Sequence, residues 1–125
     1  MSIAAMEFMN NLMQSMGIPY AFVRWEEAPP DDRYWVGEYI EAESLTLKED
    51  GFQETTFILR GYTSASWLLL EQDKEKIERN ASQTAILPNG TGIAVSYDGG
   101  SIVPTSHMDW KSMKINLKIQ EWKVK

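Results

Sequence analysis

The beginning of the chain has the hydrophobic period of an amphipathic helix, over about residues 3–15. Its methionines recur three and four positions apart, at Met6, Met9, Met13 and Met16. This spacing brings them to one side of a helix. Gly17 is a natural stop, and Ile18 before Pro19 is disfavoured in helical geometry, so the helix ends there. Methionines on one helical face usually fill gaps in a core, and the alternative is that part of this face packs against a neighbouring subunit.

A second helix is predicted from Trp67 to Asn80, where Thr63, Ser64 or Ser66 can cap its first turn. One stripe along it is apolar apart from a lysine with a long aliphatic stem: Trp67, Leu70, Lys74, Ile77 and Ala81. The other side is charged and includes Asp73, Glu75, Lys76 and Arg79. We expect the stripe to face the core and the charged side to face solvent.

The remaining segments alternate apolar and polar residues with the period of two that is typical of strands. They cover residues 20–26, 34–48, 53–62, 93–97, 101–105 and 111–124, with turn residues between them. The segments 93–97 and 101–105 flank Asp98, Gly99 and Gly100, which predicts a small hairpin. In the last segment apolar residues alternate with lysine, asparagine and glutamine, which is typical of an antiparallel sheet with one solvated face.

The order of these elements predicts an α+β fold in one domain that covers residues 1–125. We expect a single antiparallel sheet, with a mixed sheet as the alternative, and two helices packed on one face of it. The sequence contains no internal repeat, low-complexity segment or linker.

Composition narrows the chemistry available to this domain. The absence of cysteine excludes disulfides, thiol catalysis and zinc sites built on thiolates. The longest run of large apolar residues is only Trp67 to Leu70, and the apolar N-terminal segment lacks basic residues. We therefore expect no membrane span and no signal peptide, and a protein made in the cytoplasm.

The net charge of −6 argues against specific nucleic-acid binding, because a basic face supplies most of the affinity for a polyanion. The charge is nevertheless compatible with a protein that lies close to DNA without adhering to it.

No catalytic constellation emerges from the sequence. The single histidine, His107, has no nucleophile motif near it and is one ligand short of an ordinary histidine metal site. The adjacent carboxylates Asp31 and Asp32 are weak grounds for a cation site. Glu41 and Glu43 alternate with apolar residues, as a solvated strand face does. We predict a non-enzymatic protein that uses no cofactor or metal.

Aromatic residues crowd the two segments on either side of the Pro29–Pro30 turn: Tyr20, Phe22, Trp25, Tyr34, Trp35 and Tyr39. Stacking on nucleic-acid bases would require basic residues among them, and only Arg24 and Arg33 are present. Core packing accounts for most of the cluster. An exposed remainder would suit a protein interface, where tyrosine and tryptophan are enriched.

Read as a whole, the chain resembles the tail-terminator (tail-completion) and related neck or minor tail proteins of long-tailed phages and prophages. Over nearly the full length, the resemblance is carried by the N-terminal helix, the single long helix 67–80 and four short segments. These segments are Tyr34-Trp35-Val36-Gly37-Glu38-Tyr39, Glu49-Asp50-Gly51, Thr56-Phe57-Ile58-Leu59 and Val103-Pro104-Thr105, followed by the closing strand Lys114-Ile115-Asn116-Leu117-Lys118-Ile119.

The resemblance implies a virion structural subunit that forms a homo-oligomeric ring, typically sixfold, at the end of the tail tube. Its partners would be further copies of itself, the tail-tube protein and the head connector, and DNA would pass through the hole. The resemblance suggests an acidic lining for the hole, with these candidates: Glu41, Glu43, Glu49 and Asp50. The alternative is that these four residues are ordinary solvated charges.

A ring of head-to-tail contacts needs two different patches on each subunit. Trp25, Tyr34 and Trp35 are the candidates for one patch, and Met6 and Met9 on the first helix are the candidates for the other. The competing interpretation is a small monomeric domain that binds a peptide or small ligand in an exposed groove lined by tyrosine and tryptophan.

Overall fold

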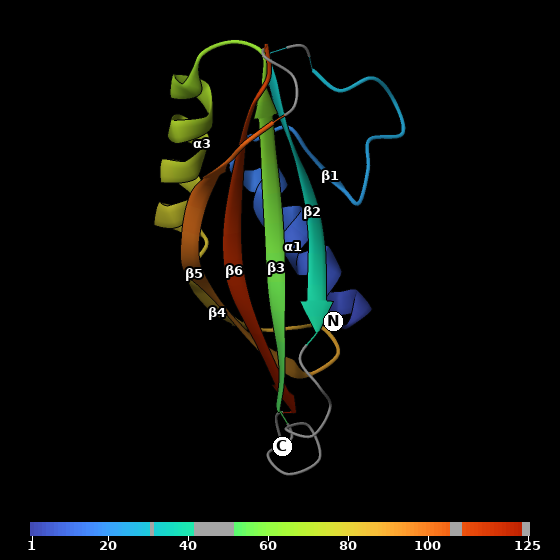
Figure 1. The fold of residues 1–125 in the computed structure, drawn as a ribbon. Coiled ribbons are helices and arrows are strands. Elements are labelled where there is room, and N and C mark those ends of the chain that lie inside the picture. Colours follow the sequence, from blue (N-terminus) through green and yellow to red (C-terminus); the bar gives the residue numbers. More distant parts are fainter. Residues whose placement is uncertain (31, 42–51, 106–108, 124–125) are drawn as a thin grey trace.

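The computed structural model describes residues 1–30, 32–41, 52–105 and 109–123. Two helices and one six-stranded sheet make up an α+β fold (Figure 1). In chain order the elements are α1 (Ile3–Ser15), β1 (Tyr20–Phe22), β2 (Arg33–Glu41), β3 (Phe52–Thr63), α3 (Trp67–Asn80), β4 (Gln83–Ile86), β5 (Thr91–Val103) and β6 (Lys111–Lys123).

Both predicted helices are confirmed with their predicted bounds, because each carries its own start and stop signals. The Ser2 hydroxyl accepts a hydrogen bond from the Ala5 N–H at 3.1 Å and caps α1. The Ser66 hydroxyl accepts one from the Leu68 N–H at 3.1 Å and caps α3. Gly17, at φ +70°, follows α1 in the left-handed conformation that glycine adopts without strain.

The sheet has the order β1-β2-β3-β6-β5-β4. Four of its five pairings are antiparallel, whereas β1 runs parallel to β2, so the mixed alternative is the correct one. The two longest pairings, β3 with β6 and β5 with β6, place β6 at the centre of the sheet. In Figure 1 the strands curl together with α1 behind them and α3 beside β5.

Two strand predictions were wrong, and one strand was missed. β1 stops at Phe22 instead of continuing to residue 26, because Val23 takes φ +70° and turns the chain away from β2. The segments 93–97 and 101–105 do not form a hairpin. Residues 93–97 and 101–103 belong to one strand, β5, which ends at Val103 and pairs with β6 on both sides of an irregularity between Tyr97 and Gly100. β4 was not predicted, since its four residues are mostly exposed and show no alternation.

The core lies between the helices and the odd-numbered side chains of the central strands. Met9 and Met13 of α1 and Leu70 and Ile77 of α3 belong to the same buried cluster as Leu117. The strand residues of this cluster are Trp35, Phe57, Leu59, Ile93, Val95, Met113, Ile115, Leu117 and Ile119. The alternation read from the last strand is therefore confirmed.

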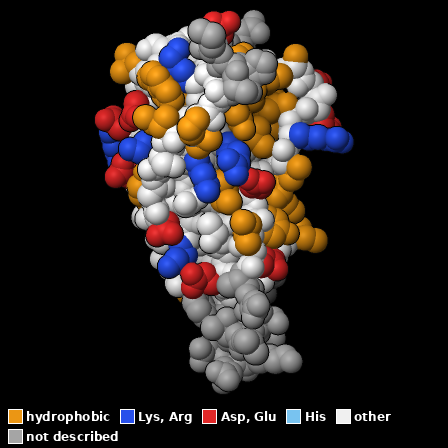
Figure 2. All heavy atoms as spheres, viewed as in Figure 1, with side chains coloured by type: hydrophobic (Ala, Val, Ile, Leu, Met, Phe, Trp, Pro, Cys, Tyr) orange, Lys and Arg blue, Asp and Glu red, His pale blue; other side chains and the backbone are white. Residues whose placement is uncertain are grey.

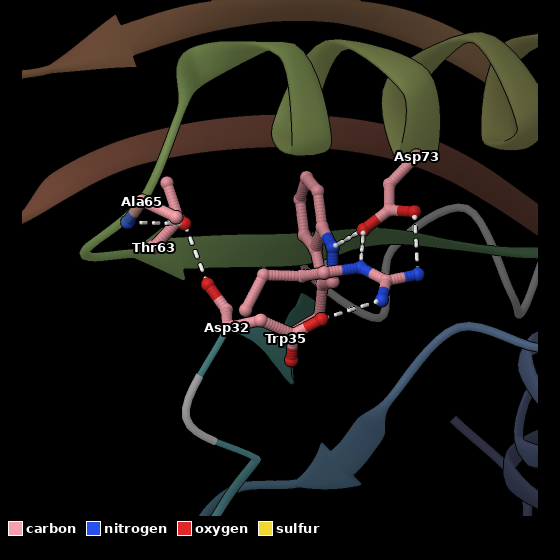
Figure 3. Close-up of polar contacts among 6 residues, drawn as sticks. Asp32, Trp35, Thr63, Ala65 and Asp73 are labelled. Carbon is pink, nitrogen blue, oxygen red and sulfur yellow. Dashed lines mark hydrogen bonds and ion pairs between the residues drawn. The ribbon is translucent and has the colours of Figure 1, made fainter.

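A buried polar contact connects α3 to β2 (Figure 3). Asp73 is only 2% exposed, so its predicted place on the solvated side of the helix was wrong. Its carboxylate accepts hydrogen bonds from Trp35 Nε1 at 2.8 Å and from Arg33 Nε and Nη2 at 2.9 and 3.2 Å. The hydrogen bonds to Asp73 raise the pKa of Arg33. Because two strand residues supply its donors, the carboxylate is stable inside the protein.

At the same end of the sheet, Thr63 connects the end of β3 to two loops. Its hydroxyl donates to the Asp32 carbonyl at 2.6 Å and accepts from the Ala65 N–H at 3.0 Å (Figure 3). These two bonds fix the chain where it leaves β3 and approaches α3.

Substitution of Gly61 by alanine is expected to lower the free energy of unfolding by about 1–3 kcal/mol, the usual cost of overpacking. A Cβ atom at Gly61 would lie 2.7 Å from the Trp35 ring. The ring is fully buried and held by Asp73, so it cannot move aside. Urea unfolding of Gly61→Ala measures the effect. Gly90→Ala is unsuitable as a control because of its φ of +86°, whereas the exposed Ala28→Gly change gives a loop reference that should stay within about 0.5 kcal/mol.

Candidate functional site

The side of the sheet that faces away from the core carries a groove of aromatic and charged residues. The strand registers put Tyr34 beside Tyr62 and Val36 beside Arg60, and they put Arg60 beside Lys114. We call the side that these residues share the open face. Figure 2 shows hydrophobic side chains gathered in its upper part, with basic side chains in the middle.

Tyr34 is the centre of an aromatic cluster on the open face. Its ring stacks on Tyr62 with centroids 5.3 Å apart, and it meets the edges of Trp25 and Trp110 at 6.2 and 6.0 Å. Burial, assisted by the neighbouring Tyr62, raises the pKa of the Tyr34 hydroxyl, so the group is a neutral hydrogen-bonding phenol at physiological pH. Rigid aromatic side chains of this kind provide contact area at a low cost in conformational entropy.

Two hollows adjoin this cluster and share Tyr34, Arg60 and Tyr62 as walls. The first, of about 480 Å³, is completed by Val103, Pro104, Thr105, Trp110 and Ser112. The second, of about 390 Å³, is completed by Val23, Arg24, Trp25, Pro29, Val36 and Glu38. We call the pair the open-face groove. Each hollow has the size of a site for a few side chains of a partner or a small ligand.

The groove is lined by two cations, Arg24 and Arg60, and one carboxylate, Glu38, and Lys114 lies beside Arg60 on the neighbouring strand. Arg60 and Lys114 are register partners on neighbouring strands, an arrangement of like charges that is unfavourable without a counter-charge. Glu38 Oε1 accepts a hydrogen bond from Arg60 Nε at 2.9 Å. Lys114 makes no ion pair with any residue in the described ranges. Glu38 thus neutralises Arg60 and leaves Lys114 without a counter-charge among the described residues.

The two lateral edges of the fold expose different apolar side chains. Val23 and Ile40 are each 63% exposed where the sheet ends at β1 and β2. On the other edge Leu68 of α3, Ile86 of β4 and Ile102 of β5 are 62–66% exposed. β1 pairs with β2 only as far as Gly37, and no other described residue pairs with that edge of β2 beyond it. Open edges with exposed apolar residues are natural places for a second chain to bind.

The structure separates the residues predicted for the two subunit patches. Trp25 and Tyr34 meet in the open-face groove, where they are half-buried. Trp35 and Met9 are wrong as interface residues, because both are fully buried in the chain's own core. The aromatic and methionine patterns could not distinguish core from interface in these two cases. Met6 is half-buried on α1 and remains a prediction.

Of the four predicted lumen residues, Glu41 alone lies in the described part of the chain. Its exposed carboxylate forms an ion pair with the α-amino group of Met1. Glu43, Glu49 and Asp50 lie outside the described residues. Among the described residues the acidic lining therefore has one candidate, and its charge is already paired.

The candidates for catalysis and metal binding are not brought together. His107 and Asp31 lie outside the described residues, and Asp32 is exposed. The pKa of Asp32 is lowered, chiefly by a hydrogen bond from the Arg33 backbone and further by the Arg33 side chain, which lies 3.2 Å away. Within the ranges that the structure covers, no three histidine or acidic side chains are close enough to hold a metal ion.

The sequence did not reveal the importance of Tyr62, Arg60, Lys114 and Trp110. Each of these residues lies on a correctly predicted strand or next to one. Whether they lie close together depends on how β2, β3 and β6 pair. Lys114 was the available signal, since it lies on the predicted solvated face of the last strand, whereas no solvated face was predicted for 53–62.

No protein-family model matches the chain, and no curated protein shows significant sequence similarity to it. None of the helices in the described part of the chain has the length and apolar character needed to cross a membrane.

Proposed function

We propose that the chain is a non-enzymatic virion structural subunit of the tail-terminator type, which assembles into a homo-oligomeric ring and joins the phage tail to the head. The observation that carries the proposal is the pair of unlike apolar edges, Val23 and Ile40 on one and Leu68, Ile86 and Ile102 on the other. Contacts between two different patches repeat from copy to copy, and they close into a ring when the rotation permits.

The ring would use the remaining surfaces in different ways. In this proposal both helices pack on one face of the sheet, so the open face is available to a neighbouring subunit. The partners outside the ring would be the tail-tube protein and the head connector, and the virion would be its final location. The net charge of −6 suits a subunit beside a DNA channel, because like charge keeps DNA from adhering.

The mass of the protein in solution tests the assembly part of the proposal. Size-exclusion chromatography with light scattering over a wide concentration range should show a species of about six times the 14.3 kDa chain, or a monomer that rises toward it. Ile40→Lys should shift this equilibrium toward monomer, because the substitution places a charge on an apolar edge. Glu78→Lys changes the charge of an exposed residue of α3 that does not share the helix face of Leu68, and it is the control.

A second test addresses the virion role. Purified tail tubes that lack their terminator should bind the protein at one end, as seen by electron microscopy with a labelled chain. Binding along the tube wall, or none, would contradict the terminator role while leaving ring formation intact.

The open-face groove favours a second candidate, a monomeric domain that binds a peptide or small ligand without catalysis. Aromatic walls around a cation are typical of such sites. A strict monomer at millimolar concentration would favour this second function over the ring.

A further inference from the structure

We infer that the open-face groove receives the acidic loop at residues 26–30 of a second copy of the chain, and that this contact is one of the joints of the ring. The inference rests on the proposed assembly and adds a charged contact to its apolar edges. The loop has the sequence Glu26-Glu27-Ala28-Pro29-Pro30.

The groove requires a negative partner. Arg60 uses Nε for Glu38, while its two terminal nitrogens have no partner within the described residues. Lys114 stands directly across from it on β6 with no ion pair in that part of the chain. Arg24, also exposed, lines the second hollow. A carboxylate placed between Arg60 and Lys114 would relieve the like-charge contact and form charge-assisted hydrogen bonds.

The loop has the complementary chemistry. Glu26 and Glu27 are exposed, and neither forms an ion pair with another described residue. Pro29 and Pro30 restrict the backbone that follows the two glutamates, so the loop loses less conformational entropy when it binds. Two exposed carboxylates on a stiffened loop therefore match the basic centre of the groove.

The base of the loop is held firmly while its acidic tip is free. Trp25 Nε1 donates to the Trp35 carbonyl at 3.2 Å. Val23 sits at φ +70° inside a tight turn, where the Arg24 N–H bonds the Phe22 carbonyl at 2.8 Å. This conformation is strained for a β-branched residue. It directs the following segment away from the sheet, and Figure 1 shows that segment standing out from the strands.

The loop does not fill the groove of its own chain. Trp25 and Pro29 already form part of the wall of the second hollow in the same chain. The first hollow, between Tyr62, Pro104 and Trp110, receives no residue of the loop. A neighbouring copy can insert its exposed Glu26 and Glu27 there, and the loop of one chain on the groove of the next is a head-to-tail contact.

A charge exchange tests this contact. One variant carries Glu26→Lys and Glu27→Lys, and the other carries Arg60→Glu and Lys114→Glu. Each variant alone should raise the protein concentration at which half of the chains are assembled by at least about tenfold. The reason is that every contact between copies then brings like charges together. An equimolar mixture should regain the wild-type mass, because each loop then meets a groove of opposite charge.

The control and the contrary outcomes separate this inference from the proposed function. Glu75→Lys with Glu78→Lys makes the same charge change on α3 as the loop variant and should assemble as wild type. Lys114→Glu alone, which leaves the Arg60–Glu38 pair in place, should weaken assembly by a smaller factor. Circular dichroism establishes that all variants fold.

A wild-type chain that stays monomeric contradicts both the ring and this joint. A wild-type ring that neither charge-reversed variant weakens contradicts the joint alone. Two weakened variants that do not restore each other also overturn it, and would point to another anion as the occupant of the groove.

Discussion

Replacement of Asp73 by alanine is expected to lower the free energy of unfolding by about 3–5 kcal/mol, the range found when one partner of a buried ion pair is removed. Asp73 is 2% exposed, and its carboxylate accepts three hydrogen bonds from two residues of β2, Arg33 and Trp35. Without it the Arg33 guanidinium, whose side chain is only 20% exposed, has no buried counter-charge, and the Trp35 indole N–H has no acceptor.

The consequence extends beyond the polar contact itself. Trp35 is the largest fully buried side chain, and its ring fills the space above Gly61. Loss of the hydrogen bond at Nε1 leaves that ring held by packing alone. α3 would also lose its polar connection to β2, so we expect its amides to exchange faster with solvent in the variant than in the wild type.

Chemical unfolding in urea measures the change, and two further variants interpret it. Asp73→Asn keeps the shape and one acceptor but removes the charge, and it should lie between alanine and wild type. Glu75→Ala removes a 71% exposed carboxylate from the same helix, where it forms an (i, i+4) pair with Arg79 at 3.9 Å. This control should stay within about 0.5 kcal/mol. Equal destabilisation by Asp73→Ala and Glu75→Ala would contradict the argument.

Truncation of Phe57 to alanine should produce a loss of similar size, about 3–5 kcal/mol, for a different reason. Phe57 is fully buried in β3, across from Leu117 of β6. Its ring stacks on Phe22 with centroids 6.3 Å apart and lies beneath Gly37. The variant therefore leaves a cavity at the place where β1 rests on the sheet.

β1 is the element that this substitution should loosen most, because it is a three-residue strand whose one pairing within the described residues is with β2. We expect the tryptophan fluorescence of the variant to report a loosened loop, since Trp25 follows β1 and depends on its position. The thermal midpoint should fall by roughly 10–20 °C, given the usual relation between free energy and midpoint for domains of this size.

The matched comparison for Phe57 is an exposed apolar residue of another element. Leu68 in the first turn of α3 is 62% exposed, so Leu68→Ala removes apolar atoms without opening a cavity. It should change the free energy of unfolding by no more than about 0.5 kcal/mol. A Phe57 variant as stable as this control would mean that the ring does not support the core.

The two helices, the long strands β2, β3 and β6, and the buried alternation of β6 follow from the sequence by itself. The reason is that their signals are local: Ser2 and Ser66 cap their helices through N–H groups within three residues, and Gly17 ends α1 where glycine is needed. In the same way, the alternation of apolar and polar residues along β6 is enough to predict which of its side chains face the core.

Tertiary structure alone decided which side chains meet. The burial of Asp73 depends on Arg33, which is 40 residues away in the sequence. From its charge alone, Asp73 was predicted to face solvent. Tryptophan and methionine occur in both protein cores and interfaces, so the residue types of Trp35 and Met9 could not tell the two apart. Both are buried in the core because the strands and helices enclose them. The groove on the open face exists because the register of β2, β3 and β6 brings Tyr34, Tyr62, Arg60 and Lys114 side by side, and strand register is set by pairing across the sheet.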